Sequence, residues 1–196
     1  MPTIVRLDRH RKDFALDVTA FYRQELTKLK GVHYSPEQIR TSLAIRVLPY
    51  FQELARQGNR KVTPQNSVTR VHLVLEGEQL IGVRETTDYV MDQDGEAMGL
   101  SRHLVWLLAE PKGRGTGTLL LDDMIQNADG VDALVLSVAG KNRRAKKLYS
   151  SKGFEYCLTF KGDSNYLSPM LTFVLPITDL GRRTLLRERK SAKLSV

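Results

Sequence analysis

The chain has 196 residues, 41% of them hydrophobic and 27% charged, with a formal net charge of +8. These fractions are typical of a soluble globular protein, and no apolar run reaches the about 20 residues that a membrane span needs. The charged N-terminal stretch excludes a secretory signal and the single cysteine, Cys157, excludes an internal disulfide framework. We therefore expect a cytoplasmic protein without membrane association, whose positive charge attracts phosphates.

Two helices are predicted in the first third of the chain. Apolar residues recur at helical spacing over residues 11–30, and Gly31 follows where a helix would end. The second helix begins at Ser35-Pro36, where a cap residue precedes a proline in the first helical position, and it extends to about Gln57. Pro49 is expected to kink or interrupt this second helix.

Strands follow, because the apolar period changes to two. Residues 71–75 and 80–83 flank a Glu-Gly-Glu-Gln turn and predict a hairpin. A second turn at 92–95 leads to a strand around 102–109. These segments predict an antiparallel meander.

The second half of the chain alternates between helices and strands. A helix is predicted over about 117–128, a buried central strand over 133–138, and a basic helix over 142–152. Two more strands are expected near 155–160 and 170–176. The order predicts the α/β class, with a mixed sheet in one domain.

The domain organisation follows from the length and the charge distribution. We expect one domain over residues 1–180 and a basic C-terminal tail over 181–196, which forms either a loose tail or a short helix. No internal repeat or low-complexity segment interrupts the domain.

The segment EPKGRGTGTLLLDDMI, residues 110–125, contains three alternating glycines immediately before a helix. Such a loop presents backbone amides and the positive end of the helix dipole, and this combination favours anions. No Gly-Lys-Ser/Thr closes the loop, and Gly113, Gly115 and Gly117 give G-x-G-x-G, so neither a Walker A loop nor the dinucleotide fingerprint is present.

A second motif makes the interpretation specific. Residues 134–154 read LVLSVAGKNRRAKKLYSSKGF, an apolar strand followed by Asn-x-x-Ala-x-x-Leu-Tyr-x-x-x-Gly-Phe. With K-G-R-G-T-G at 112–117, this region closely resembles the GNAT superfamily of acetyl-CoA-dependent N-acyltransferases, over about 104–157. The family pattern has Gln/Arg-x-x-Gly-x-Gly/Ala between the fourth strand and the third helix, and Lys112 departs from it at the first position.

The resemblance implies the GNAT fold, with a central, mostly antiparallel sheet and helices on both faces, and a binding site for acetyl-CoA. The loop amides would bind the pyrophosphate, the end of the preceding strand would offer backbone groups to the pantetheine arm, and one strand amide would polarise the thioester carbonyl. Asn142 would bond the pantetheine, and cations of the basic helix would lie near the phosphates. The implied cofactor-binding residues are Val105, Trp106, Leu107, Lys112, Gly113, Arg114, Gly115, Thr116, Gly117, Thr118, Asn142, Arg143, Lys146 and Tyr149.

The resemblance also implies a proton donor. Tyr149 lies two helical turns after Asn142 and would protonate the departing thiolate, since a tyrosine hydroxyl is protonated at neutral pH. Several residues are candidates for the base that accepts the proton of the attacking amine. Ser137 could hold a water there, and the other candidates are Glu85, Asp88, His103 and Glu110. The four histidines are dispersed without metal-ligand spacing, so no metal is expected.

The sequence therefore predicts direct transfer of an acetyl group to a primary amine on a protein, an aminoacyl-tRNA or a small molecule. The alternatives are a non-catalytic acyl-CoA sensor and a nucleic-acid-interacting module. Cations beyond those near the cofactor, on the basic helix and the C-terminal segment, are candidates for contact with RNA or an acidic partner. The sequence does not specify which amine is the acceptor, which acyl chain is preferred or whether the protein forms a homodimer.

Overall fold

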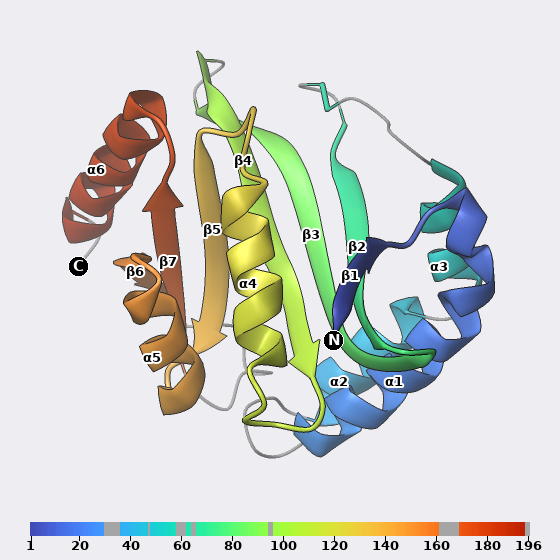
Figure 1. Ribbon diagram of the computed structural model, residues 1–196. Helices are drawn as coiled ribbons and strands as arrows, with labels where there is room; N and C mark the ends of the chain where they lie inside the picture. The colour runs from blue at the N-terminus through green and yellow to red at the C-terminus, as the bar shows by residue number, and fades with distance from the viewer. Residues whose placement is uncertain are drawn as a thin grey trace.

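The computed structural model describes residues 1–29, 36–46, 48–57, 62–63, 66–93, 96–160 and 169–194. Its centre is one seven-stranded sheet with the order β1-β2-β3-β4-β5-β7-β6 (Figure 1). The strands are β1 (Thr3–Arg6), β2 (Val68–Glu76), β3 (Gln79–Gln93), β4 (Glu96–Ala109), β5 (Ala133–Ala139), β6 (Glu155–Phe160) and β7 (Met170–Pro176). The pairing of β4 with β5 is parallel and the other pairings are antiparallel, which confirms the predicted fold class.

Helices cover both faces of the sheet. They are the 3-10 helix η1 (Arg9–Phe14), α1 (Ala15–Leu29), α2 (Pro36–Ile45), α3 (Leu48–Gln57), α4 (Thr116–Gln126), α5 (Arg143–Ser151) and α6 (Asp179–Leu194). One core cluster joins α1 and α3 to β2, β3 and β4, and a second joins α4 and α5 to β4, β5 and β7. Because alternate strand residues point to opposite faces, α4 and α5 lie on one face, while α1–α3 and α6 lie on the other.

The predicted elements are present, with three differences. The second predicted helix is two helices, α2 and α3, divided just before Pro49. The first begins as the 3-10 turn η1, in which Arg11 has non-helical backbone angles. The strand β1 was missed because four residues give no periodic signal, and β2 provides its partner. The expected cap Ser35, and residues 94–95 of the turn predicted at 92–95, lie outside the described residues.

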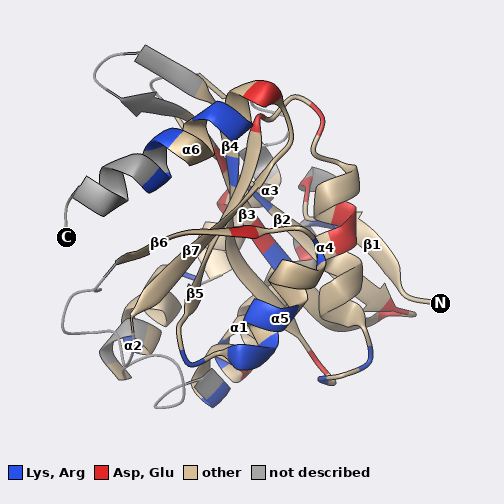
Figure 2. Cartoon of the chain, turned by 90° about the vertical axis from the view of Figure 1, so that its left-hand side faces the viewer, with Lys and Arg blue, Asp and Glu red and all other residues tan. Residues whose placement is uncertain are grey.

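The C-terminal segment is a helix of 16 residues that packs on the sheet. Leu185 is buried among residues of β5, β6 and β7, and the Arg189 Nε donates to the Tyr156 carbonyl oxygen at 2.9 Å. The predicted boundary between residues 180 and 181 therefore falls inside α6. Lys and Arg residues are concentrated along α5 and α6 (Figure 2).

No helix in the described part of the chain is long and apolar enough to cross a membrane.

Charged groups surround His72 on the face of the sheet that carries α4. Burial and, to a smaller extent, the neighbouring guanidinium groups together lower the pKa of His72 to about 2. These groups come from the four strands β1 to β4: Arg84, Arg6, Arg102 and Arg70. The imidazole is therefore neutral in the folded protein at any pH above about 2.

The neutral His72 predicts a loss of stability in mild acid. The unfolded chain takes up a proton at His72 as the pH falls below 6.5, its ordinary pKa, whereas the folded chain does not. This group alone should lower the free energy of unfolding by about 2 kcal/mol between pH 7 and pH 5. Urea unfolding of the wild type and of His72→Gln at both pH values measures this difference. Parallel pH dependences of the two proteins would contradict it.

Candidate active site

A cleft forms where β4 and β5 part. The two strands pair only from Ser101 to Leu104 of β4 with Ala133 to Leu136 of β5. Past Leu104, the edge of β4 that faces β5 has no strand partner among the described residues. Its backbone groups can therefore pair with a ligand.

A β-bulge in β4 lies at the same point. Leu104 is opposite Thr86 and Trp106 is opposite Glu85, so Val105 is the additional residue of β4. The bulge turns Trp106 toward the core cluster of α1, whereas Leu104 and Leu107 face the cluster of α4 and α5. The cleft is therefore walled by side chains of both faces of the sheet.

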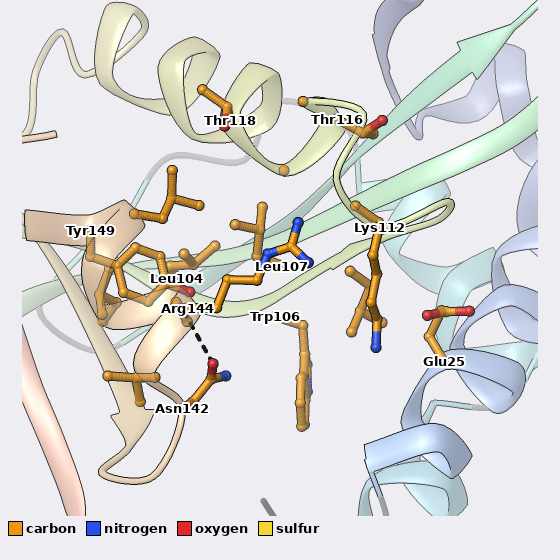
Figure 3. A pocket seen from close by; sticks show the side chains of 18 of the residues that line it. Glu25, Leu104, Trp106, Leu107, Lys112, Thr116, Thr118, Asn142, Arg144 and Tyr149 are labelled. Atoms are coloured by element: carbon orange, nitrogen blue, oxygen red, sulfur yellow. Dashed lines mark hydrogen bonds between the residues drawn. The ribbon is translucent and has the colours of Figure 1, made fainter. Parts of the chain in front are cut away.

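The cleft has a volume of about 580 Å³. It is lined by α1, β4, the glycine loop, the start of α4, β5 and α5 (Figure 3). Its lining includes these residues of the predicted site: Val105, Trp106, Leu107, Lys112, Gly113, Gly115, Thr116, Gly117, Thr118, Ser137, Asn142 and Tyr149. Two motifs that are separated by 25 residues of sequence thus meet in one cavity.

The glycine loop ends in an uncapped helix start. Gly113 and Gly115 have φ angles of +96° and +86°, a region that glycine adopts without strain. Gly115 is the N-cap residue of α4, and no side chain caps this helix end. The first-turn amides and the positive end of the helix dipole are therefore directed at the cleft.

Gly82 on β3 holds this helix start close to the sheet. A Cβ atom at Gly82 would lie 2.6 Å from the Thr116 Cγ2 and 3.2 Å from the Leu120 Cδ1. Only a residue without a side chain allows the first turn of α4 to pack here. No sequence pattern connects Gly82 with the site, because it lies 34 residues before Thr116.

The helix α5 forms the opposite wall. The Asn142 Oδ1 accepts a hydrogen bond from the Ala145 amide at 3.1 Å, so Asn142 is the N-cap of α5. Tyr149 is 8% exposed and lines the cleft from the same helix, with its ring 6.1 Å from that of Phe154. The cap fixes the start of the helix that carries the tyrosine.

Three predicted cations do not line the cleft: Arg114, Arg143 and Lys146. Arg144 lines it instead, and its Nη2 lies 3.6 Å from the position that a Cβ on Gly113 would occupy. The reason is helical geometry: residues four apart share a face, and Arg144 shares that of Leu148. Arg143 shares the outward face with Lys147.

Glu85, a predicted catalytic residue, lies outside the lining and is 2% exposed. Its carboxylate accepts hydrogen bonds from the Arg46 Nε at 2.8 Å and Nη2 at 2.9 Å. The Tyr22 and Tyr50 hydroxyls donate to it at 2.8 and 2.9 Å. The expectation that Glu85 acts as a base is therefore corrected: both of its oxygens are engaged in a buried ion pair.

The other candidate bases are also placed by the fold. Asp88 pairs with Arg70 and Arg102, and burial lowers the pKa of His103 on β4; neither lines the cleft. Glu110 pairs with Lys28 at 3.3 Å. Ser137 does line the cleft, with its Oγ 3.4 Å from the Thr172 Oγ1.

The charges in the cleft are divided between its walls. Lys112 and Arg144 are the cations among its described lining residues, and Glu25 of α1 is the acid. Figure 3 shows Glu25 at the end of the cleft away from Tyr149 and Asn142, with Trp106 between them. Sequence reasoning missed Glu25 because it lies 85 residues before the glycine loop, on a helix without a motif.

Comparison with protein-family models and with curated proteins finds no match to the sequence. Solved structures do match. An acetyltransferase of the GNAT family from Streptococcus pneumoniae is 17% identical and has a TM-score of 0.62, covering 90% of this chain and 100% of that one. The ribosomal-protein-S18-alanine N-acetyltransferase from Escherichia coli is 19% identical with a TM-score of 0.56, covering 91% and 95%.

A third match is a chain in the structure of the NatC complex bound to Gag peptide and CoA. It is 15% identical with a TM-score of 0.58, covering 90% of this chain and 99% of that one. The matches extend over almost the whole length of both chains at low identity. The chain therefore has the fold of the GNAT N-acetyltransferases.

Proposed function

We propose that the protein is an acetyl-CoA-dependent N-acetyltransferase that acts by direct transfer to a primary amine. The observation that carries this proposal is the meeting of an uncapped, glycine-rich helix start and Tyr149 in one cleft, at the point where β4 and β5 part. The shared fold supports it, and the CoA in the NatC structure supports the same cofactor here.

The residues of the cleft fit the chemical groups of coenzyme A. The amides at the start of α4, with Lys112 and Arg144, suit a pyrophosphate. The unpartnered edge of β4 suits the amide groups of the pantetheine arm. The Asn142 Oδ1 is engaged in the cap, so its Nδ2 is the atom that would donate to the pantetheine.

Acetyl-CoA supplies the thioester from which the acetyl group is transferred. The Tyr149 hydroxyl would donate its proton to the departing thiolate, and a backbone amide of β4 would polarise the thioester carbonyl. The Ser137 Oγ, on β5, would hold a water through which the proton of the attacking amine passes to the solvent. Binding both substrates in one cleft supplies the proximity.

A binding experiment tests the proposal directly. Calorimetric titration of acetyl-CoA into the wild type should give one-to-one binding that weakens as the salt concentration rises. Gly117→Glu should abolish it, because a carboxylate would occupy the anion site. Gly117→Ala is the matched control and should retain binding, since its Cβ would meet only side-chain carbons at 4.0 Å. A folded wild type that does not bind acetyl-CoA would overturn the proposal.

A second acceptor class is an amine linked to RNA, such as that of aminoacyl-tRNA. The observation in its favour is the exposed cations of α5 and α6 that do not line the cleft, among them Arg143, Lys147, Arg182 and Arg183. Transfer to such an acceptor should depend steeply on salt, because phosphate contacts release counterions. Transfer to a small amine, measured at saturating acetyl-CoA, should not.

A further inference from the structure

We propose that Glu25 binds a cationic group of the acceptor other than the amine that reacts, so that the preferred acceptors carry a second amine, which stays cationic. This inference rests on the acetyltransferase function proposed above. It concerns the wall of the cleft that α1 forms.

Glu25 is placed to bind a cation. It is 3% exposed and is the acidic residue among the described lining of the cleft. The Lys28 Nζ already lies 2.6 Å from its Oε1, so the position accommodates an ammonium group. The hydrogen bond to Glu25 raises the pKa of Lys28, which keeps that group charged.

Lys28 has a second partner. Its Nζ lies 3.3 Å from the Glu110 Oε2, at the end of β4, and its side chain is 38% exposed. When a ligand ammonium approaches Glu25, Lys28 can keep its pairing with Glu110. Lys28 thus acts as an internal competitor that an acceptor displaces without leaving a buried charge unpaired.

The cation at Glu25 is not the reacting amine, for two reasons. A carboxylate stabilises the charged form of an amine, whereas the attacking amine has to be neutral. Glu25 also lies at the end of the cleft away from Tyr149 (Figure 3). Trp106 lies between the two ends and offers an aromatic surface to the carbon chain that joins two amines.

Trp106 makes the proposal measurable, since it is the single tryptophan of the chain. The probes are 1,4-diaminobutane, 1,6-diaminohexane and 1,8-diaminooctane, each compared with the monoamine of the same chain length. Titration followed by tryptophan fluorescence should show at least one diamine that binds about tenfold more tightly than its monoamine. Glu25→Gln should remove this preference.

Two further variants should change the affinity for diamines in opposite directions, which a merely structural role of Glu25 would not produce. Lys28→Gln removes the competing ammonium and should tighten diamine binding several-fold. Glu110→Gln leaves Glu25 as the partner for which Lys28 and the diamine compete, and it should therefore weaken diamine binding.

Equal binding of diamines and monoamines by the wild type, or a preference that survives in Glu25→Gln, would overturn the inference. A separate titration with acetyl-CoA keeps the two proposals apart. If the protein binds acetyl-CoA but prefers no diamine, the proposed cofactor stands and only this inference is wrong. A diamine preference would count against an RNA-linked acceptor, because Glu25 repels phosphate.

Discussion

Replacing Tyr149 with phenylalanine is expected to lower kcat by a factor of about 10² to 10⁴, the range that one positioned general acid contributes. The Kd for acetyl-CoA should change little, because the ring keeps its packing against Phe154 and only the hydroxyl is lost. The measurement is the rate of CoA release with an amine acceptor found by screening, together with a calorimetric Kd for each variant.

The matched control for Tyr149→Phe is Tyr156→Phe. Tyr156 lies on β6, is 48% exposed, and its hydroxyl is 2.8 Å from the Thr159 Oγ1, outside the cleft. This control should leave kcat unchanged. If Tyr149→Phe were as active as the wild type, the thiolate would have another proton source and the role proposed for Tyr149 would be wrong. An acyl-CoA sensor would bind acetyl-CoA without turnover in either protein.

Replacing Arg46 with methionine is expected to cost about 3–5 kcal/mol of unfolding free energy, because it leaves the Glu85 carboxylate buried without its cation. The pair is deeply enclosed: the side chains are 10% and 2% exposed. The guanidinium carbon also lies 5.6 Å from the centre of the Trp106 ring and 5.8 Å from that of Tyr22. Urea unfolding measures the loss.

Two comparisons test the cause of that loss. The double variant Arg46→Met with Glu85→Leu removes both charges and should recover much of the stability, since no charge is left buried alone. Arg182→Gln breaks an exposed pair with Glu155 at 3.9 Å and should cost less than about 1 kcal/mol. If the double variant were as unstable as Arg46→Met, the unpaired buried charge would not be the main cause of the stability loss. The Tyr22 and Tyr50 hydroxyls, whose pKa values are raised by burial and by Glu85, would then be the groups to examine.

The pair also bears on the site, although neither residue lines the cleft. Arg46 packs against Trp106, and Trp106 lines the same cleft as Glu25. Loss of Arg46 should therefore alter the tryptophan fluorescence in addition to the stability. Glu85, one of the candidate bases predicted from the sequence, is thus linked through Arg46 to a residue that lines the cleft.

The sequence by itself determined the segments whose function depends on local backbone. The glycines before α4 and the Asn142–Tyr149 segment act through a helix start, an N-cap and a fixed helical spacing. Each of these is encoded within a few residues, so the motifs predicted the two walls of the cleft. Helices and strands also depend largely on the residues within each segment, which is why their order from α1 to β7 was predicted.

Only the tertiary structure decided which side chains meet across long separations. Arg144 lines the cleft, whereas Arg143 and Lys146 do not, because the orientation of α5 against the sheet determines which of its faces is directed at the cleft. The tertiary structure places Glu85 in a buried pair with Arg46, 39 residues away, and brings Glu25 to the cleft that the glycine loop forms. It also docks α6 on the sheet through Leu185. Charge and hydrophobicity in a sequence identify candidate site residues, but packing and strand register determine which of these residues face the same cavity.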